Sequence, residues 1–361
     1  MNQRSIKSIE GLRAIASLGI LLCHFAGSFY PGFTGTWVWN SPLKIFLAGE
    51  PFVRIFFTLS GLVVTEKYLT KRCYEQAPKD AFNRYFRLLP MVVLACLFAY
   101  LLMKLGLTFN ARAAEIAGTS DFLGIFNQFP ANLGECLKEA FYGVFAGTGN
   151  QYVSPFWTIQ YEFLGVLLVL AILCVFRENP LRYLCYAVIL LFTANQYTYF
   201  VLGMVIAELN HCEKFRSLLA KNQIINTLLL IGVFCLFGAQ DIFDDNKLWR
   251  IYYGILLAAF LLLLMTNRPA DRILGSKAGC LLGKWSFGIY SFHWPVMISL
   301  MSYLYIVWEN RTFLTMALIF VITVIATLLL AWGATVVSDL ARKGIDKAEN
   351  QLEYVWNKIR Q

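Results

Sequence analysis

The feature that most constrains this chain is a series of long apolar blocks separated by short polar segments. Of the 361 residues, 58% are hydrophobic and only 15% are charged, against about 45–50% and about 25% in soluble domains. The blocks approach the roughly 20 residues with which a helix crosses a bilayer. We therefore predict an all-α, polytopic integral membrane protein with about ten transmembrane helices. The predicted spans are Ala14–Tyr30, Phe52–Leu69, Leu88–Leu107, Phe156–Phe176, Tyr183–Asn195, Thr198–Leu209, Ile224–Ala239, Ile251–Thr266, Leu281–Tyr305 and Phe313–Ser338.

Basic residues are distributed unevenly among the segments that join these blocks. With the N-terminus placed in the cytoplasm, roughly 23 of the 31 Lys and Arg residues fall on that side, including those in Lys67–Arg87 and Arg342–Arg360. Because cytoplasmic loops collect positive charge, we predict that both termini are cytoplasmic. The same distribution accounts for the net charge of +9 without a nucleic-acid partner. We expect membrane lipids, and no nucleic acid, among the partners.

Two segments outside the predicted spans are long enough to form structure of their own: an outer loop and the C-terminal tail. Thr108–Pro155, the longest segment on the outer side, is Gly-rich with scattered aromatic residues. A loop of this length is usually functional, and we expect it to fold back over the outer mouth. Residues 341–361 carry apolar residues at helical spacing. We interpret them as a cytoplasmic amphipathic tail on the bilayer, with a solvated tail as the alternative, and residues 1–340 as the transmembrane domain.

The first apolar block carries two ionisable side chains, Arg13 and His24. Their spacing of eleven residues is about three helical turns, which places both on nearly the same face, about 16 Å apart along the axis. Ionisable groups inside a membrane are costly and are functional candidates by default. The alternative is an interfacial Arg13 that snorkels to the membrane surface, with His24 bonded to a neighbouring helix.

Four further stretches also carry ionisable side chains. Arg54 needs an anionic partner or an aqueous cavity. Arg84 and Arg87, three residues apart, share a helix face and form either a phosphate clamp or a plain positive-inside anchor. Glu162, just inside a predicted span, could orient and stabilise an imidazole general base. His293 is flanked by aromatic residues and followed by a proline, and a satisfied core histidine is the simpler interpretation.

Five stretches, which follow one another along the chain in the family's order, resemble membrane acyltransferase family 3. Glu10-Gly-Leu-Arg13 with His24 resembles the family's Arg-x10-His signature, and Phe56-Phe-Thr-Leu-Ser-Gly61 its FFxLSG stretch. Arg84-Tyr-Phe-Arg87 resembles its RxxR, and Tyr290-Ser-Phe-His-Trp-Pro295 its YxxHWP. Phe156-Trp-Thr-Ile-Gln-Tyr-Glu162 resembles its LWSLxxE element. The chain departs from the family pattern at Glu10 and at Arg54, where the family often has Asp; the second change reverses a charge.

The resemblance implies a membrane-embedded O-acyltransferase that moves an acyl group, most simply acetyl, from cytoplasmic acetyl-CoA to a hydroxyl of a cell-surface or lipid-linked saccharide. Its site would need no metal. Such a protein would reside in a bacterial plasma membrane. His24 would be the general base, or the carrier of a covalent acyl group, with Glu162 as its aid. Arg13, Arg84 and Arg87 would hold acyl-CoA. Supporting roles fall to Glu10, Ser60, Trp157, Tyr290 and His293. The alternative function is a transporter or flippase of a lipid-linked saccharide that performs no acyl-transfer chemistry.

Overall fold

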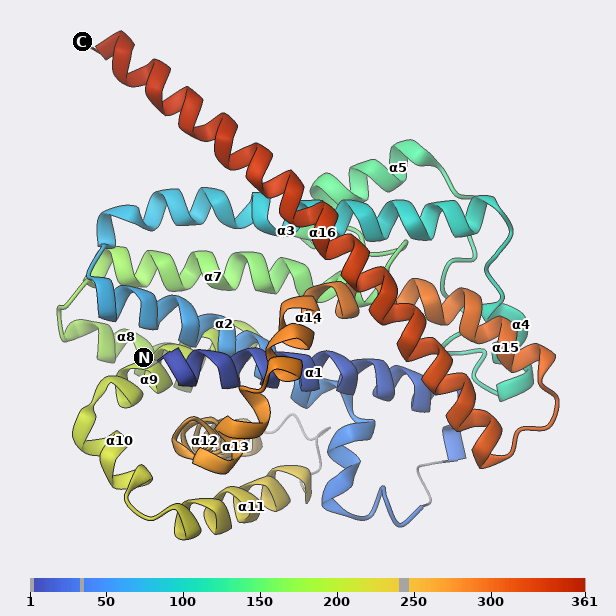
Figure 1. Ribbon diagram of the computed structural model, residues 1–361, viewed down its shortest axis with the longest axis horizontal. Coiled ribbons are helices and arrows are strands. Elements are labelled where there is room, and N and C mark those ends of the chain that lie inside the picture. The colour runs from blue at the N-terminus through green and yellow to red at the C-terminus, as the bar shows by residue number, and fades with distance from the viewer. Residues whose placement is uncertain (1–2, 33–35, 240–246, 361) are drawn as a thin grey trace.

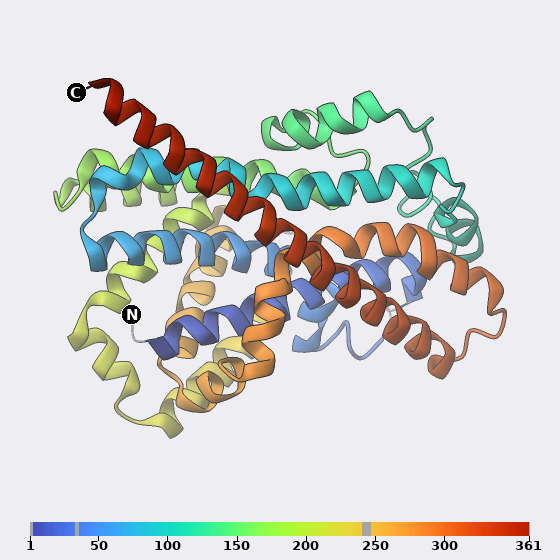
Figure 2. The same ribbon diagram turned by 45° about the horizontal axis from the view of Figure 1, so that its top comes forward.

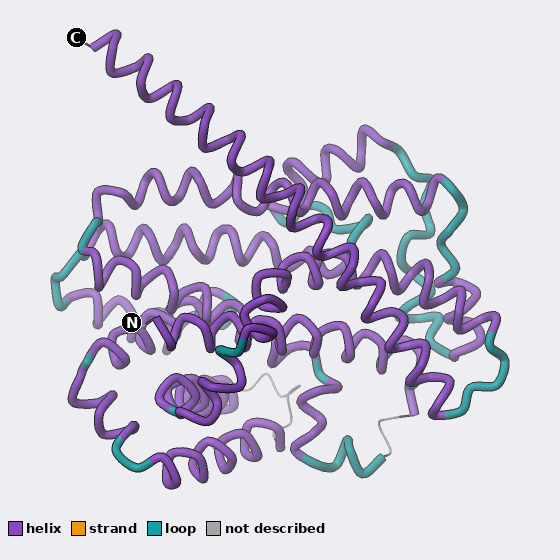
Figure 3. Tube along the Cα trace, viewed as in Figure 1, coloured by secondary structure: helices purple, strands orange, loops and turns teal. Residues whose placement is uncertain are grey.

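A computed structural model describes residues 3–32, 36–239 and 247–360. Helices make up 83% of the structure, and the described residues contain no strand. Figure 3 shows short loops joining these helices at the ends of the bundle. The predicted all-α fold class is confirmed.

Within the described ranges, four helices are long and apolar enough to cross a membrane: α1 (Gln3–Phe29), α3 (Ala77–Lys104), α7 (Trp157–Phe176) and α16 (Phe313–Arg360). The number rises to 6 if each of two bent pairs counts as one span. These pairs are α10 (Glu213–Ala220) with α11 (Gln223–Ala239), and α12 (Lys247–Thr266) with α13 (Arg268–Leu274). The predicted count of ten spans and the cytoplasmic placing of the termini stay predictions.

The helices α1, α3 and α7 lie roughly parallel to one another and to α2 (Gly49–Lys71), and α16 crosses this group (Figure 1). The C-terminal end of α16 projects beyond the other helices in both views (Figures 1 and 2). This helix continues through residue 341 without a break. The amphipathic tail predicted for residues 341–361 is therefore an extension of α16, and the domain boundary at 340 stays a prediction.

Glycines bring the helices that carry the site into close contact. A Cβ atom on Gly61 of α2 would lie 2.1 Å from the carbonyl oxygen of Phe200 on α9 (Tyr197–His211). A Cβ atom on Gly283 of α14 (Lys277–Val296) would lie 2.2 Å from the carbonyl oxygen of Glu10 on α1. Small residues permit such approaches between membrane helices. At Gly61 this approach brings α2 against α9.

Two of the predicted spans are broken or shortened. The fifth is only α8 (Leu181–Phe192), which a short loop joins to α9. The ninth consists of α14, a π-turn over Met297–Met301 and α15 (Ser302–Val307). Pro295 lacks the amide hydrogen that a regular helix would need at this place, and the π-turn begins two residues after it.

About half of the segment Thr108–Pro155 is helical, and it folds back onto the bundle; its predicted place over the outer mouth stays a prediction. It contains α4 (Asn110–Ala117), α5 (Leu133–Lys138), a π-turn (Glu139–Gly143) and α6 (Val144–Ala146). The Thr119 hydroxyl donates to the carbonyl oxygen of Ser28 on α1, at 2.8 Å. The Tyr85 hydroxyl on α3 donates to the carbonyl oxygen of Phe141, also at 2.8 Å. The segment therefore also runs along α3, which the sequence analysis did not anticipate.

A buried carboxylate fixes the last part of this segment. Glu139 accepts hydrogen bonds from the backbone amides of Gln151 and Tyr152, each at 2.9 Å. Asn127 donates through Nδ2 to the carbonyl oxygens of the same two residues, at 3.3 and 3.1 Å. Burial raises the pKa of Glu139, and the two amide bonds only partly oppose this effect. The backbone that leads into α7 is thus fixed by Glu139 at its amide groups and by Asn127 at its carbonyl groups.

Candidate active site

A cavity of about 360 Å³ lies among α1, α2, α3, α7, α14 and α16, and we call it the basic cavity. It collects most of the residues that the sequence analysis selected, although they come from five separate helices. Those that line it are Glu10, Arg13, Ser60, Arg84, Arg87, Glu162 and Tyr290. The motifs that are far apart in the sequence therefore meet in one place.

An ion pair between Arg84 of α3 and Glu162 of α7 crosses the basic cavity. The Ser60 hydroxyl of α2 donates to the same oxygen of Glu162, Oε1, at 2.6 Å. The other oxygen, Oε2, is buried without a hydrogen-bond partner among the described residues. Glu162 was expected to aid His24, but within the described chain it makes no hydrogen bond to that histidine. The structure places it as the counter-ion of Arg84 instead.

Positive charge dominates the lining of the basic cavity. Arg13 pairs with Glu10 at 3.3 Å, between Nη1 and Oε1, whereas Arg87 is exposed and has no ion pair with any described residue. Two further cations, Lys284 and Arg342, also line the cavity. Five basic and two acidic side chains thus surround a space that suits an anionic ligand.

Lys284 and Arg342 were missed by the sequence analysis as site residues. Both contact Asp339 on α16: Lys284 Nζ lies 3.2 Å from Oδ2, and Arg342 Nη1 lies 3.8 Å from Oδ1. In the sequence they belong to basic stretches that were assigned to membrane orientation. Nothing in those stretches signals that α14 and α16 bring them to the cavity wall.

His24 lies outside the lining of the basic cavity, in a group of aromatic rings. Its ring stacks on Phe122, with centroids 6.3 Å apart, and on His293, at 5.3 Å. The Trp294 ring stands at 73° to it, at 5.4 Å, and Phe126 packs on Trp294 at 5.0 Å. We call these five residues the ring cluster. It joins α1 and α14 to the segment Thr108–Pro155.

The ring cluster contains three buried nitrogen atoms without hydrogen-bond partners among the described residues. They are Nδ1 of His24, Nε2 of His293 and Nε1 of Trp294. Nδ1 of His293 lies 2.5 Å from the carbonyl oxygen of Tyr290. Because a carbonyl only accepts, Nδ1 carries the proton and Nε2 is left with a free lone pair. His293, expected to be a satisfied core histidine, is therefore satisfied on one side of its ring only.

Tyr290 connects the two regions. It lines the basic cavity, and its ring centroid lies 5.7 Å from that of His293. Its hydroxyl hydrogen-bonds to Thr158, 2.6 Å away, and to the carbonyl oxygen of Pro155. Ile20, which also lines the cavity, precedes His24 by one helical turn. The basic cavity and the ring cluster are therefore neighbours along α1 and α14.

Two residues singled out in the sequence lie away from both regions. Trp157 is 38% exposed and packs on Tyr161 rather than lining the basic cavity. Arg54 pairs with Glu50 at 3.0 Å and lies 4.3 Å above the ring of Tyr253. The prediction that Arg54 requires an anionic partner is confirmed, and this partner is supplied by its own helix.

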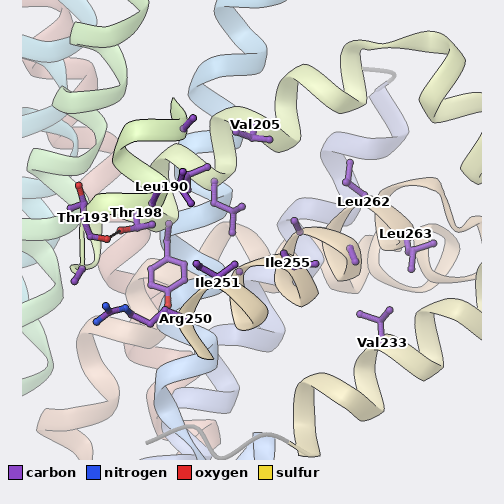
Figure 4. Close-up of a pocket in the computed structure, with 18 of the residues that line it drawn as sticks. Leu190, Thr193, Thr198, Val205, Val233, Arg250, Ile251, Ile255, Leu262 and Leu263 are labelled. Carbon is purple, nitrogen blue, oxygen red and sulfur yellow. Dashed lines mark hydrogen bonds between the residues drawn. The ribbon is translucent and has the colours of Figure 1, made fainter. Parts of the chain in front are cut away.

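A larger cavity of about 830 Å³ lies among α8, α9, α11 and α12 and contains none of the predicted site residues. Figure 4 shows its wall, with Arg250 towards one end and Leu262 and Leu263 towards the other. Arg250 is the only charged side chain among the described residues that line it. This wall is mostly apolar and holds none of the motif residues, so we assign the site to the smaller basic cavity and the ring cluster.

Comparison with known families decides the identity of the chain. A family described as an acyltransferase domain, acyltransferase family 3, matches residues 6–336. The chain belongs to this family. The match includes every residue of the basic cavity except Arg342, and the whole ring cluster. No curated protein and no solved structure matches the chain. With its apolar helices, this member of acyltransferase family 3 is a membrane protein.

Proposed function

We propose that the protein transfers an acyl group, most simply acetyl, from cytoplasmic acyl-CoA to a hydroxyl of a cell-surface or lipid-linked saccharide. The observation that carries this proposal is the basic cavity, where five cations face a space next to an unpartnered histidine. Coenzyme A is polyanionic and has a long flexible arm. Such a donor needs cations at one end and a narrow path to the reacting group at the other.

The cations differ in how free they are to bind phosphate. Arg87 has no ion pair with a described residue and offers a planar fork of donors to a phosphate. Arg13 is held by Glu10, and Arg84 by Glu162. We assign the first contact with the nucleotide phosphates to Arg87, with Arg13 beside it. Arg84, Glu162 and Ser60 form the fixed frame along which the pantetheine arm passes.

His24 acts as the general base in this proposal. The acceptor hydroxyl oxygen attacks the carbonyl carbon of the thioester while His24 takes the hydroxyl proton. The tetrahedral intermediate then collapses, the C–S bond breaks, and the leaving thiolate takes the proton from His24. The products are the O-acyl saccharide and free coenzyme A. No metal enters this sequence, and neutral imidazole is the state that the reaction requires.

The positions of the basic stretches support a plasma-membrane protein whose donor enters from the cytoplasm. Arg13 and Arg87 belong to segments that the charge asymmetry assigns to that side. A bacterial plasma membrane fits a cytosolic donor and an acceptor displayed outside. The helical extension over residues 341–360 would project into the cytoplasm.

Thiol release by the purified protein in lipid nanodiscs tests the proposal. We expect coenzyme A to be released from acetyl-CoA only when a saccharide acceptor is present, with one acetyl ester formed for each thiol. Net movement of a lipid-linked saccharide across vesicles without any thiol release would contradict the proposal and favour a flippase. Trapping with hydroxylamine separates the general-base route from the acyl-histidine route.

A further inference from the structure

The turn of α14 that follows Tyr290 carries a side chain with no role so far, Trp294. Its exposed fraction is 1%, and its indole Nε1 is buried without a hydrogen-bond partner among the described residues. An indole N–H can only donate. Leaving a buried donor unsatisfied destabilises the folded protein. An unsatisfied indole N–H beside the proposed base indicates that a bound ligand accepts its hydrogen bond.

The surroundings of Trp294 indicate where that ligand would lie. Its ring stands at 73° to the ring of His24, with centroids 5.4 Å apart. The ring that offers a proton acceptor and the ring that offers a proton donor are therefore in edge-to-face contact, and a polar nitrogen of each has no partner among the described residues. Acyl transfer needs this pair of groups: a base for the attacking hydroxyl, and a donor for the negative charge that forms on the carbonyl oxygen.

We propose that Trp294 is a catalytic residue whose indole N–H donates to the oxyanion of the tetrahedral intermediate. This inference rests on the proposed acyl-transfer function. When the acceptor oxygen attacks, the electron pair of the carbonyl double bond moves onto oxygen, where the indole N–H meets it. When the C–S bond breaks, the double bond reforms and the donor is released. Trp294 neither gains nor loses a proton.

The fold holds the indole in place for this role. Phe126 packs at 89° on Trp294, with centroids 5.0 Å apart, and the following residue Asn127 is tied to the carbonyl oxygens of Gln151 and Tyr152. Donors that are fixed before the reaction stabilise a transition state without paying for reorganisation at that moment. The segment Thr108–Pro155 thus contributes directly to the reaction centre.

A single-atom replacement tests the proposal. Trp294 is replaced by 3-benzothienylalanine, in which sulfur stands in place of the N–H and the ring shape is kept. We expect kcat to fall by about 10²–10³-fold, as for the loss of one oxyanion donor, with the KM and the dissociation constant of acetyl-CoA unchanged. Trp294→Phe should likewise lower kcat and leave the KM for acetyl-CoA unchanged. The matched control is the same replacement at Trp332, which is 54% exposed on α16, and it should retain wild-type kcat.

Each other outcome counts against the proposal. A benzothienyl variant at position 294 with wild-type kcat would overturn it, and so would a parallel loss of acetyl-CoA affinity and thermal stability, which marks a structural N–H. A wild-type protein that transfers no acyl group would overturn the proposed function as well. An active wild type with an equally active variant would overturn this inference alone.

Discussion

The basic cavity and the ring cluster adjoin each other at Tyr290 but differ in charge and in how fully their polar groups are paired. In the cavity, charged side chains are abundant and most are paired, as in Arg84–Glu162 and Arg13–Glu10. In the ring cluster no member carries a fixed charge, and three polar nitrogen atoms have no partner among the described residues. The contrast shows that charged groups and unpartnered neutral groups are segregated, and in the proposed function the first region would bind the polyanionic donor and the second would carry out proton transfer.

The largest effect should come from His24→Gln, which keeps the size and hydrogen bonding of the side chain but cannot accept the proton. We expect kcat to fall by about 10²–10⁴-fold, as for a lost general base, while the affinity for acetyl-CoA stays unchanged. Single-turnover transfer with radiolabelled acetyl-CoA and equilibrium binding measure the two quantities. A variant with wild-type transfer would remove His24 from the mechanism.

His293→Gln is the matched control within the ring cluster. An amide can keep a bond to the Tyr290 carbonyl oxygen but loses the stacking on His24. The stacked ring 5.3 Å away helps to hold His24 in position, and an aromatic pair is worth about 1 kcal/mol, so kcat should fall only about five-fold. A loss as large as that of His24→Gln would show that the two histidines act as one unit.

The next two effects should differ between Arg87 and Arg84, which both line the basic cavity. Arg87→Ala removes a free phosphate donor, and loss of a charge-assisted contact of about 1.5–3 kcal/mol should raise the KM for acetyl-CoA by about tenfold or more. Arg84→Ala should do more damage, because it leaves Glu162 without its counter-ion. Thermal unfolding in detergent should show a loss of stability for Arg84→Ala alone.

The double variant Arg84→Gln with Glu162→Gln sharpens this distinction. It removes both charges, so stability should recover relative to Arg84→Ala. Recovery of stability without recovery of transfer would confirm that the pair shapes the path of the donor. If both single alanine variants bind acetyl-CoA normally, the two arginines are only membrane anchors.

Smaller effects are expected for Lys284→Ala and Arg342→Ala. Both cations share Asp339, and Lys284 is largely exposed, so each contact is screened by water and salt. We expect a rise in the KM for acetyl-CoA of about two- to five-fold at low salt, on the scale of about 1 kcal/mol or less for an exposed charge pair, and no change in kcat. Titration with NaCl should abolish the difference from wild type.

The smallest effect concerns Glu139, which supports the ring cluster from a distance. Because burial raises its pKa, the folded segment binds this proton more tightly than the unfolded chain does. Its contribution to stability is present below the ordinary Glu pKa of about 4.3 and is lost as the pH rises through the raised value. Hydrogen exchange of residues 132–152 should therefore become faster, relative to its intrinsic rate, over that range. Glu139→Gln should flatten this pH dependence.

Sequence reasoning found the helices and most of the basic cavity because the governing signals are local. Long apolar blocks predict membrane helices, and an ionisable residue within one stands out against its neighbours. For this reason Glu162 was selected, whereas Arg84 was selected for its spacing from Arg87 and Ser60 through the family resemblance. The family motifs then indicated that these stretches belong together.

What the sequence did not reveal depends on tertiary contacts. The partner of Glu162 is Arg84 rather than His24, and only the packing of α3 against α7 determines this. Lys284 and Arg342 are indistinguishable from membrane anchors until α14 and α16 are in place. The indole N–H of Trp294 has no hydrogen-bond partner among the described residues. No residue pattern in the sequence predicts such a missing contact.

The central claim is that the donor binds in the basic cavity with its acyl end at the ring cluster. Photo-cross-linking with two acyl-CoA analogues, one labelled on the acyl group and one on the adenine, tests it most directly. We predict that the acyl label marks peptides containing residues 20–24 or 290–294, and the adenine label marks those containing Arg87, Lys284 or Arg342. Acyl labelling in the large apolar cavity, or an acyl label at the cationic end, would contradict the account.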